Sequence, residues 1–476
     1  MNKRLVSLKP WLFFIIYFLF LRLPSLFEPY WYGDEAIYLV LGQAIRKGIT
    51  LYSQIHDNKP PSLYYLAALS RTVFGFRLLL LLWMIPTNYF FYKLSRKFFN
   101  SFFSKLSLFI FITLTSIPLI EGNIANAEIF MLLPTILAFL LFNPSNLNSL
   151  TASALFLGIA FTFKMPALLD FAALSFFFLL TSSKKFLPFL SKAFIFVFSF
   201  ISPFLIFAIF YWSKNALPEF LNSSLLQNFP YLSSWQTGGH SSSPLQGGLL
   251  YRGIVLVVFW LYSLILYYRK KINQNHLLLL LWLSSAIFGV FLSGRPYPHY
   301  LLQAVPPFCL TFIYLFYKNN SFIKSVLILS VMAILGLTTF NFYFYRNRGY
   351  YKAFYLNFDN PQVFQDFFGP QVSQSQQIVD YLSSKNIADK KLFIWGDAPY
   401  IYAKLNILPS DKFTVAYHIV DFKTHSQTLD RIKINTPEFI LYYPMDNRPF
   451  EKLDQFIYRY YALDYVIDNV SIYRKR

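Results

Sequence analysis

The chain has 476 residues, of which 56% are hydrophobic, 21% aromatic and only 13% charged, and its formal net charge is +20. Soluble domains carry far more charge, so this composition excludes a soluble protein and indicates a membrane protein that crosses the bilayer several times. The single cysteine, Cys309, lies in an apolar segment. One cysteine excludes a disulfide framework and a cluster of thiolate metal ligands.

Apolar segments long enough to cross a ~30 Å hydrocarbon core recur along the chain and predict about eleven transmembrane helices. They begin near Trp11, Arg77, Phe102, Ala125, Ser149, Pro166, Leu187, Gly248, His276, Tyr300 and Phe322. The first lacks a small-residue cleavage pattern before Glu28, so we expect a retained helix rather than a cleaved signal peptide.

Basic residues predict the orientation of these helices. With the N-terminus inside, the predicted inner loops carry Lys93, Arg96, Lys97, Lys105, Lys184, Lys185, Arg269, Lys270, Lys271, Lys318 and Lys324. This is the bias of membrane proteins toward positive inner loops. It accounts for most of the net charge, so we expect no nucleic-acid partner.

Acidic residues gather on the opposite, outer side. Before Arg346 they are Glu28, Asp34, Glu35, Asp57, Glu121, Glu128, Asp170 and Glu219, all at or near the predicted outer face. A few basic residues break the inner bias and join them there: Arg46, Lys47, Lys59, Arg71, Lys164 and Arg295. Charges gathered at a membrane boundary mark a substrate or ion site, and these cations suit an anion such as a lipid phosphate.

From about Arg346 the chain becomes polar, which divides it into a membrane domain over 1–345 and a second domain over 346–476 on the outer side. Helical patterns at 376–384 and 398–405 alternate with strand patterns at 392–396 and 439–443, which predicts a small α/β domain. His418 and His425 are isolated in the sequence, and we assign this domain no catalytic role. The long polar segment 213–247 is either a binding loop or a plain connector.

Several motifs resemble the GT-C superfamily of glycosyltransferases that use polyprenyl-phosphate sugars, in particular the protein mannosyltransferase and aminoarabinose transferase branch. They are GDEAIY at 33–38, Gly48 with Leu51-Tyr52, KPP at 59–61, NIANAE at 123–128, GIAFTFK at 158–164 and RPYPHY at 295–300. The resemblance implies a polytopic helical fold with an acidic pair in the first outer loop. Asn58 stands where the aminoarabinose transferases have a glutamate implicated in metal binding, so a divalent metal is possible but is not carried over.

The chemistry of such a transfer needs a base for the acceptor hydroxyl and positive charge for the departing phosphate. Asp34 is the predicted base, and Lys59 and Lys164 are the predicted phosphate contacts. Further candidates are Glu35 and Glu128 as catalytic carboxylates, Arg295 on the phosphate, and His56, Asp57, His299 and Tyr300 as substrate contacts. We expect a sugar to pass, with inversion, to a glycan, lipid or protein of the cell envelope.

Each assignment has a structural alternative. Asp34 or Glu35 can cap the following helix, Lys59 can snorkel to the membrane surface, and Glu128 can satisfy a neighbouring helix. A transporter or flippase of lipid-linked glycans is the alternative function, although transporters place their ionisable groups near the bilayer midplane. A membrane-anchored binding protein whose C-terminal domain does the work is a third.

Overall fold

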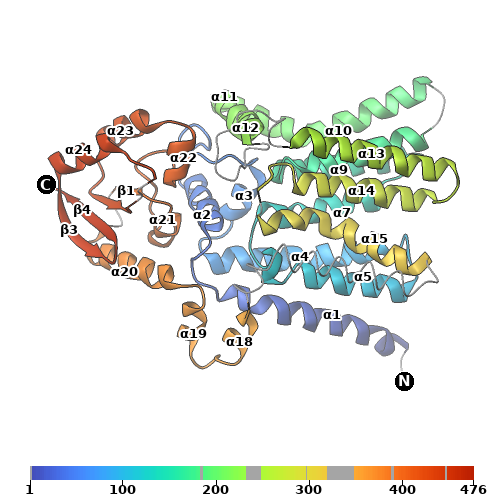
Figure 1. Cartoon of the computed structure of the whole chain (residues 1–476), viewed down its shortest axis with the longest axis horizontal. Helices are drawn as coiled ribbons and strands as arrows, with labels where there is room; N and C mark the ends of the chain where they lie inside the picture. Colours follow the sequence, from blue (N-terminus) through green and yellow to red (C-terminus); the bar gives the residue numbers. More distant parts are fainter. Residues whose placement is uncertain are drawn as a thin grey trace.

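The computed structural model describes residues 3–182, 186–231, 248–295, 297–318, 348–387, 391–444 and 447–476. A bundle of long helices forms one end of the molecule and a small α/β domain forms the other, with α2 and α3 between them (Figure 1). The N-terminus lies at the end of the bundle that faces away from the α/β domain, as Figure 1 shows.

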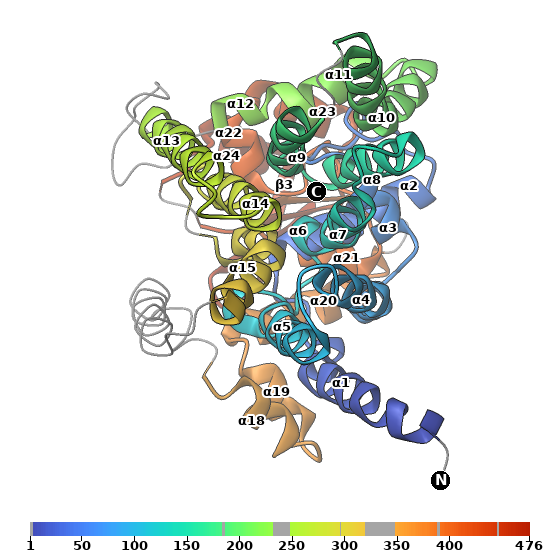
Figure 2. The same ribbon diagram turned by 90° about the vertical axis from the view of Figure 1, so that its right-hand side faces the viewer.

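The bundle consists of apolar helices that run side by side (Figure 2). They are α1 Lys3–Leu26, α4 Val73–Ser95, α5 Ser101–Leu114, α6 Ala127–Phe130 with α7 Leu132–Leu141, α8 Leu147–Phe163, α9 Ala167–Thr181, α10 Phe186–Ser213, α13 Leu249–Tyr268, α14 Gln274–Val290 and α15 Val305–Lys318. In the described ranges, four helical stretches are long and apolar enough to cross a membrane, and six further apolar helices are shorter. They correspond to the first ten predicted segments, whereas the segment predicted near Phe322 lies outside the described residues.

The outer surface of the bundle is itself apolar. On α10, Phe194 and Ile206 are 71% and 67% exposed, and on α13 Val255 is 67% exposed. Large apolar side chains in such numbers on a surface are costly in water but favourable against lipid. The bundle therefore has the surface of a protein embedded in a bilayer.

Short elements cover the end of the bundle that faces the α/β domain. They are α2 Gly33–Arg46, α3 Ser62–Ala68, η1 Pro118–Ile120, α11 Leu217–Leu221, the π-helical turn η2 Asn222–Leu226, α12 Asn228–Tyr231 and η3 Pro298–Ala304. Helix α2 is buried along most of its length. Gly42 allows this packing, because a Cβ there would lie 2.6 Å from the backbone carbonyl carbon of Ala67 in α3.

The C-terminal domain combines a four-stranded sheet, in the order β1-β2-β4-β3, with short helices. Its elements are α18 Tyr350–Tyr355, α19 Pro361–Asp366, α20 Pro370–Ser384, β1 Leu392–Trp395, α21 Pro399–Leu405, α22 Ala416–Asp421, α23 His425–Ile434, β2 Phe439–Tyr442, α24 Glu451–Tyr460, β3 Tyr461–Ile467 and β4 Val470–Lys475. Strands β1 and β2 are parallel and in register from Leu392 opposite Phe439. β4 pairs antiparallel with β2 and β3. The predicted helix at 376–384 lies within α20, and the segments predicted at 392–396, 398–405 and 439–443 match β1, α21 and β2 to within one residue.

The domain is packed firmly onto the bundle. One buried apolar cluster runs from the bundle helices through α2 into α20, α21 and one face of the sheet. A second cluster, around Phe393, Trp395 and Ile440, fills the other face. The predicted boundary at 345/346 falls in a part of the chain that the structure does not describe.

Candidate active site

A polar cavity of about 800 Å³ lies where one end of the bundle meets the C-terminal domain. We call it the polar cavity. Its lining residues are Tyr32, Asp34, Asn58, Lys59, Lys164, Gln227, Asn228, Arg295, Tyr297, His299, Tyr300, Tyr417, His418, Asp421, Phe422 and Arg448. Segments far apart in the sequence therefore meet here, and most of their side chains are charged or can form hydrogen bonds.

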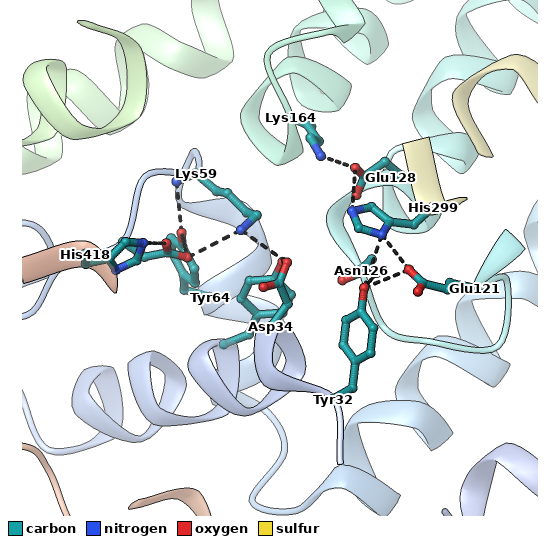
Figure 3. Close-up of polar contacts among 12 residues, drawn as sticks. Tyr32, Asp34, Lys59, Tyr64, Glu121, Asn126, Glu128, Lys164, His299 and His418 are labelled. Carbon is teal, nitrogen blue, oxygen red and sulfur yellow. Dashed lines mark hydrogen bonds and ion pairs between the residues drawn. The ribbon is translucent and has the colours of Figure 1, made fainter. Parts of the chain in front are cut away.

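Asp34 and Lys59 face each other on one wall of the polar cavity (Figure 3). The Lys59 ammonium lies 3.6 Å from Asp34 Oδ2 and 3.8 Å from Asp57 Oδ2. Asp34 stands in the first turn of α2, and Tyr38 one turn later donates a hydrogen bond of 3.0 Å to its Oδ2. The lysine is thus shared between a carboxylate in the cavity and one buried beneath it.

The backbone around Lys59 is fixed by its neighbours. Tyr52 donates a 2.9 Å hydrogen bond to the Lys59 carbonyl oxygen, and the Lys59 N–H donates to the Tyr64 hydroxyl at 3.1 Å. Tyr64 in turn donates to Asp57 Oδ2 at 2.7 Å. The prolines that follow Lys59 lead directly into α3, so the lysine is held at a fixed place on the cavity wall.

A second polar group, on the bundle side of the polar cavity, contains Lys164, Glu128, His299, Glu121 and Tyr32 (Figure 3). Lys164 pairs with Glu128, and His299 Nε2 lies 3.6 Å from Glu128 Oε1. The other ring nitrogen, Nδ1, lies 2.6 Å from Glu121 Oε2, which also accepts a 2.8 Å hydrogen bond from Tyr32. His299 therefore bridges two carboxylates, one of which holds Lys164.

Glu121 is in a left-handed backbone conformation, with φ of 56°. A glutamate is strained there, and strained residues cluster at functional sites. The η1 turn that ends at Glu121 brings its carboxylate back toward His299, although nothing in the local sequence identifies that turn as part of a site.

The charges shift the pKa of the cavity groups. Burial alone would raise the pKa of Asp34, but Lys59, then His299, the Tyr38 hydrogen bond and Lys164 together lower it below the ordinary value. Burial lowers the pKa of Lys164, an effect that Glu128 opposes. Asp34 is therefore a carboxylate at neutral pH and is able to accept a proton.

Glu35 lies outside the polar cavity, although it directly follows Asp34. Its carboxylate accepts hydrogen bonds from Arg77 Nη2 at 2.5 Å and Nε at 2.9 Å, and from the Ala125 N–H at 2.7 Å. Arg77 also pairs with Glu28 at 2.6 Å. These side chains are fully buried, so Glu35 joins α2 to α4.

The remaining predicted residues separate into two sets. Arg295, His299 and Tyr300 line the polar cavity, and the Lys164 ammonium lies 4.3 Å from the centre of the Tyr300 ring. His56 and Asp57 are buried behind the cavity wall. His56 Nδ1 lies 3.2 Å from the Ser223 hydroxyl, and its backbone N–H donates to the Lys412 carbonyl oxygen of the C-terminal domain at 2.8 Å.

A second, mainly apolar cavity of about 290 Å³ adjoins the polar one. We call it the apolar cavity. Both cavities are lined by Asn58, Lys59, Lys164, Asn228 and Tyr300. Beyond these, the apolar cavity is formed largely by Met165, Pro166, Leu168, Leu169, Phe229 and Leu292. The two lysines therefore stand at the junction of a polar and an apolar space.

The C-terminal domain contributes more to the site than the sequence indicates. Tyr417, His418 and Asp421 of α22, then Phe422, and finally Arg448 all line the polar cavity. His418 Nε2 lies 3.7 Å from Asp57 Oδ1. Burial lowers the pKa of His418, although Asp57 opposes the effect, so the ring is neutral at pH 7. These partners are hundreds of residues apart in sequence, and no local pattern reveals them.

Metal binding was left open by the sequence. Within the ranges that the structure describes, no group of three or more His, Cys, Asp or Glu side chains is placed to hold a metal ion. Asn58, at the position where a metal-binding glutamate was considered, lines both cavities, and its carbonyl oxygen accepts a 2.9 Å hydrogen bond from Asn228.

Known proteins similar to this chain are similar in structure and not detectably in sequence. No protein-family model matches the sequence. No curated protein matches it either. ArnT from Cupriavidus metallidurans, in a crystal structure bound to undecaprenyl phosphate, is 11% identical, with a TM-score of 0.61 over 98% of each chain. An oligosaccharyltransferase from Archaeoglobus fulgidus is 12% identical, with a TM-score of 0.46 over 92% of this chain and 70% of that chain.

The fold of this chain is therefore that of ArnT over nearly its whole length. This confirms, at the level of the fold, the resemblance to the GT-C superfamily that the outer-loop motifs indicated. This fold and the apolar helices together indicate a multi-pass membrane protein.

Proposed function

We propose that this protein is a glycosyltransferase that moves a sugar from a polyprenyl-phosphate donor to an envelope acceptor on the extracytoplasmic face of the membrane. The observation that carries the proposal is the position of Lys59 and Lys164 between the polar and the apolar cavity, with Asp34 3.6 Å from Lys59. A lipid-linked sugar phosphate has the same order of parts: an apolar chain, an anionic phosphate and a polar sugar.

In this arrangement the prenyl chain occupies the apolar cavity, and the phosphate lies between the two lysines. Lysine binds phosphate as a point charge, so two lysines on opposite sides stabilise the charge that grows on the leaving phosphate. The sugar then extends into the polar cavity. The fold likeness to ArnT, whose structure contains undecaprenyl phosphate, supports a ligand of this class.

The reaction follows from this placement. The acceptor hydroxyl attacks the anomeric carbon of the sugar, Asp34 takes the hydroxyl proton, and the bond from the anomeric carbon to the phosphate oxygen breaks. Polyprenyl phosphate leaves as a stable anion, so the leaving group needs no protonation by a general acid. A single displacement inverts the anomeric configuration, in contrast to retaining glycosidases, which use a second carboxylate as nucleophile.

The charge pattern of the loops supports the extracytoplasmic face. The cavities lie at the bundle end opposite the N-terminus, and the basic loops predict that the N-terminus is inside. The acceptor is a glycan, a lipid or a protein of the envelope.

Transfer assays with the purified full chain in lipid nanodiscs test the proposal. A panel of polyprenyl-phosphate sugars is offered with extracted envelope glycans, lipids and proteins as acceptors. We expect at least one productive pair, with release of polyprenyl phosphate. If no pair reacts while the protein moves lipid-linked sugars across proteoliposomes, the protein is a flippase instead.

A further inference from the structure

One wall of the polar cavity belongs to the C-terminal domain and has no part in the proposed phosphate site. Helix α22 contributes Tyr417, His418 and Asp421, and Arg448 follows from the loop after β2. None of these residues lines the apolar cavity. With the phosphate at the junction of the cavities, this wall faces the sugar end of the ligand.

One carboxylate, that of Asp397, holds two parts of this wall together. Asp397, just after β1, accepts a hydrogen bond from the Tyr417 N–H at 3.1 Å and pairs with Arg448 Nη1 at 2.5 Å. The start of α22 is also held by the Ala416 N–H, which donates to the Gly396 carbonyl oxygen at 3.1 Å. The wall therefore lies at the carboxyl ends of the parallel strands β1 and β2, the place where open α/β sheets bind ligands.

Buried polar atoms of His418 and Gln227 have hydrogen-bonding needs that the described part of the chain does not meet. Among the described residues, Nδ1 of His418 and the side-chain oxygen of Gln227 are buried without a hydrogen-bond partner, and His418 is only 4% exposed. Buried polar atoms are nearly always satisfied by protein, water or ligand. The Gln227 oxygen and the Asp421 carboxylate are hydrogen-bond acceptors, so a ligand that pairs with them brings donors.

This requirement separates a sugar from a phosphate. A phosphate dianion offers only acceptors, whereas each sugar hydroxyl donates and accepts. Tyr417 and Phe422 also line the cavity and add aromatic, apolar area to the same wall, against which a sugar ring can pack. From these observations we propose that the inner wall of the C-terminal domain, formed by Tyr417, His418, Asp421 and Phe422 with Gln227 opposite, binds sugar hydroxyls and determines which carbohydrate the site accepts.

The inference rests on the proposed function, and the bound carbohydrate is either the donor's sugar or an acceptor glycan. The test compares the wild type with Asp421→Asn, His418→Asn and His418→Gln, and uses Asp430→Asn as the matched control. Asp430 is an exposed carboxylate of α23 outside the cavity lining. The probes are undecaprenyl phosphate, undecaprenyl-phosphate hexoses, and the same hexoses lacking single hydroxyls.

The two histidine variants distinguish contact with the sugar from a structural role. An asparagine amide occupies the place of Nδ1, which lacks a partner, whereas a glutamine amide reaches the place of Nε2 beside Asp57. If Nδ1 binds the sugar, His418→Asn keeps selectivity and His418→Gln loses it. If His418 only supports Asp57, the order is reversed, and His418 is then removed from the sugar-binding wall.

We expect Asp421→Asn and His418→Gln to lower kcat/KM for the intact sugar by about tenfold or more, with a smaller loss for one deoxy analogue. Affinity for undecaprenyl phosphate should stay unchanged, and Asp430→Asn should match the wild type.

A raised KM for the acceptor, with unchanged discrimination among donors, would assign the wall to the acceptor glycan. Unchanged selectivity toward all donors and acceptors, or equal weakening of undecaprenyl phosphate binding, would overturn the inference. If the wild type transfers no sugar at all, the proposed function fails. The sugar-binding wall is then tested by binding alone. If every variant binds sugar-linked and sugar-free undecaprenyl phosphate equally well, the wall does not bind the sugar.

Discussion

Asp34→Asn is the sharpest single test of the proposed chemistry. The amide is nearly the same size as the carboxylate and still accepts the hydrogen bond from Tyr38. It does not accept the acceptor's proton. General base catalysis contributes ~10²–10⁴-fold, and each factor of ten corresponds to about 1.36 kcal/mol in the barrier. Turnover should therefore fall by about 10²–10⁴-fold, or roughly 2.7–5.4 kcal/mol.

Donor binding responds differently, because Asp34 also competes for Lys59. The pair is 3.6 Å apart, and its side chains are 18% and 31% exposed. Partly exposed ion pairs of this kind are worth about 0.2–1 kcal/mol. Removal of the carboxylate charge releases Lys59 for the phosphate, so affinity for polyprenyl phosphate should hold or tighten by up to about fivefold.

Single-turnover kinetics and equilibrium binding of polyprenyl phosphate measure the two effects separately, and NMR of the product gives the anomeric configuration. Glu35→Gln is the matched control, since it makes the same chemical change one residue later. Its cost should appear in folding instead, at about 1.5–3 kcal/mol, because the amide loses charge-assisted hydrogen bonds from the buried Arg77, which keeps Glu28 as its other partner. Near-normal turnover of Asp34→Asn, or a product that retains the donor's configuration, would refute the role of Asp34 as base.

Three further predictions follow from the same geometry. Lys59→Met and Lys164→Met should each weaken binding of polyprenyl phosphate by about 1.5–3 kcal/mol in equilibrium binding, and unchanged affinity in both would remove the lysines from the site. Asp34 loses its base function as pH falls through its pKa, which Lys59 helps to lower despite burial. The wild type should therefore keep its kcat/KM to a lower pH than Lys59→Met does. Identical pH profiles would show that Lys59 does not lower the pKa of Asp34. Cysteines placed at Ser53 and Ser383 should react with an impermeant label in intact cells, and labelling only after permeabilisation would put the cavities on the wrong face.

The sequence predicted the membrane helices and part of the small domain for clear physical reasons. Long apolar runs are unambiguous, and β1 and β2 are short apolar strands buried on both faces. Strands β3 and β4 were missed because β3 lacks a regular apolar–polar alternation and follows α24 directly, so no turn marks its start and no partner strand was expected after it. The count of about eleven helices was reached by segment length alone, and ten of those segments have apolar helices in the described part of the chain.

The site was predicted only where its signal is local. Lys59 and Lys164 stood out as basic residues on the predicted outer side, and Asp34 as the first residue of the acidic pair there. All three line the polar cavity. Contacts that depend on tertiary packing were not visible. His418 was judged isolated because its neighbour Asp57 precedes it by most of the chain, and Glu121 reaches His299 through a backbone conformation that a glutamate rarely adopts.

The acidic pair at 34–35 shows how one motif divides between chemistry and folding. Successive residues of a helix point about 100° apart, so on α2 the first carboxylate faces the cavity while the second turns into the protein and meets Arg77. The buried ion pair joins α2 to α4 and, through the Ala125 N–H, to the segment that carries Glu128. The residue that performs the proposed reaction is thus held in place by its sequence neighbour, so replacement of Asp34 should lower turnover whereas replacement of Glu35 should lower stability.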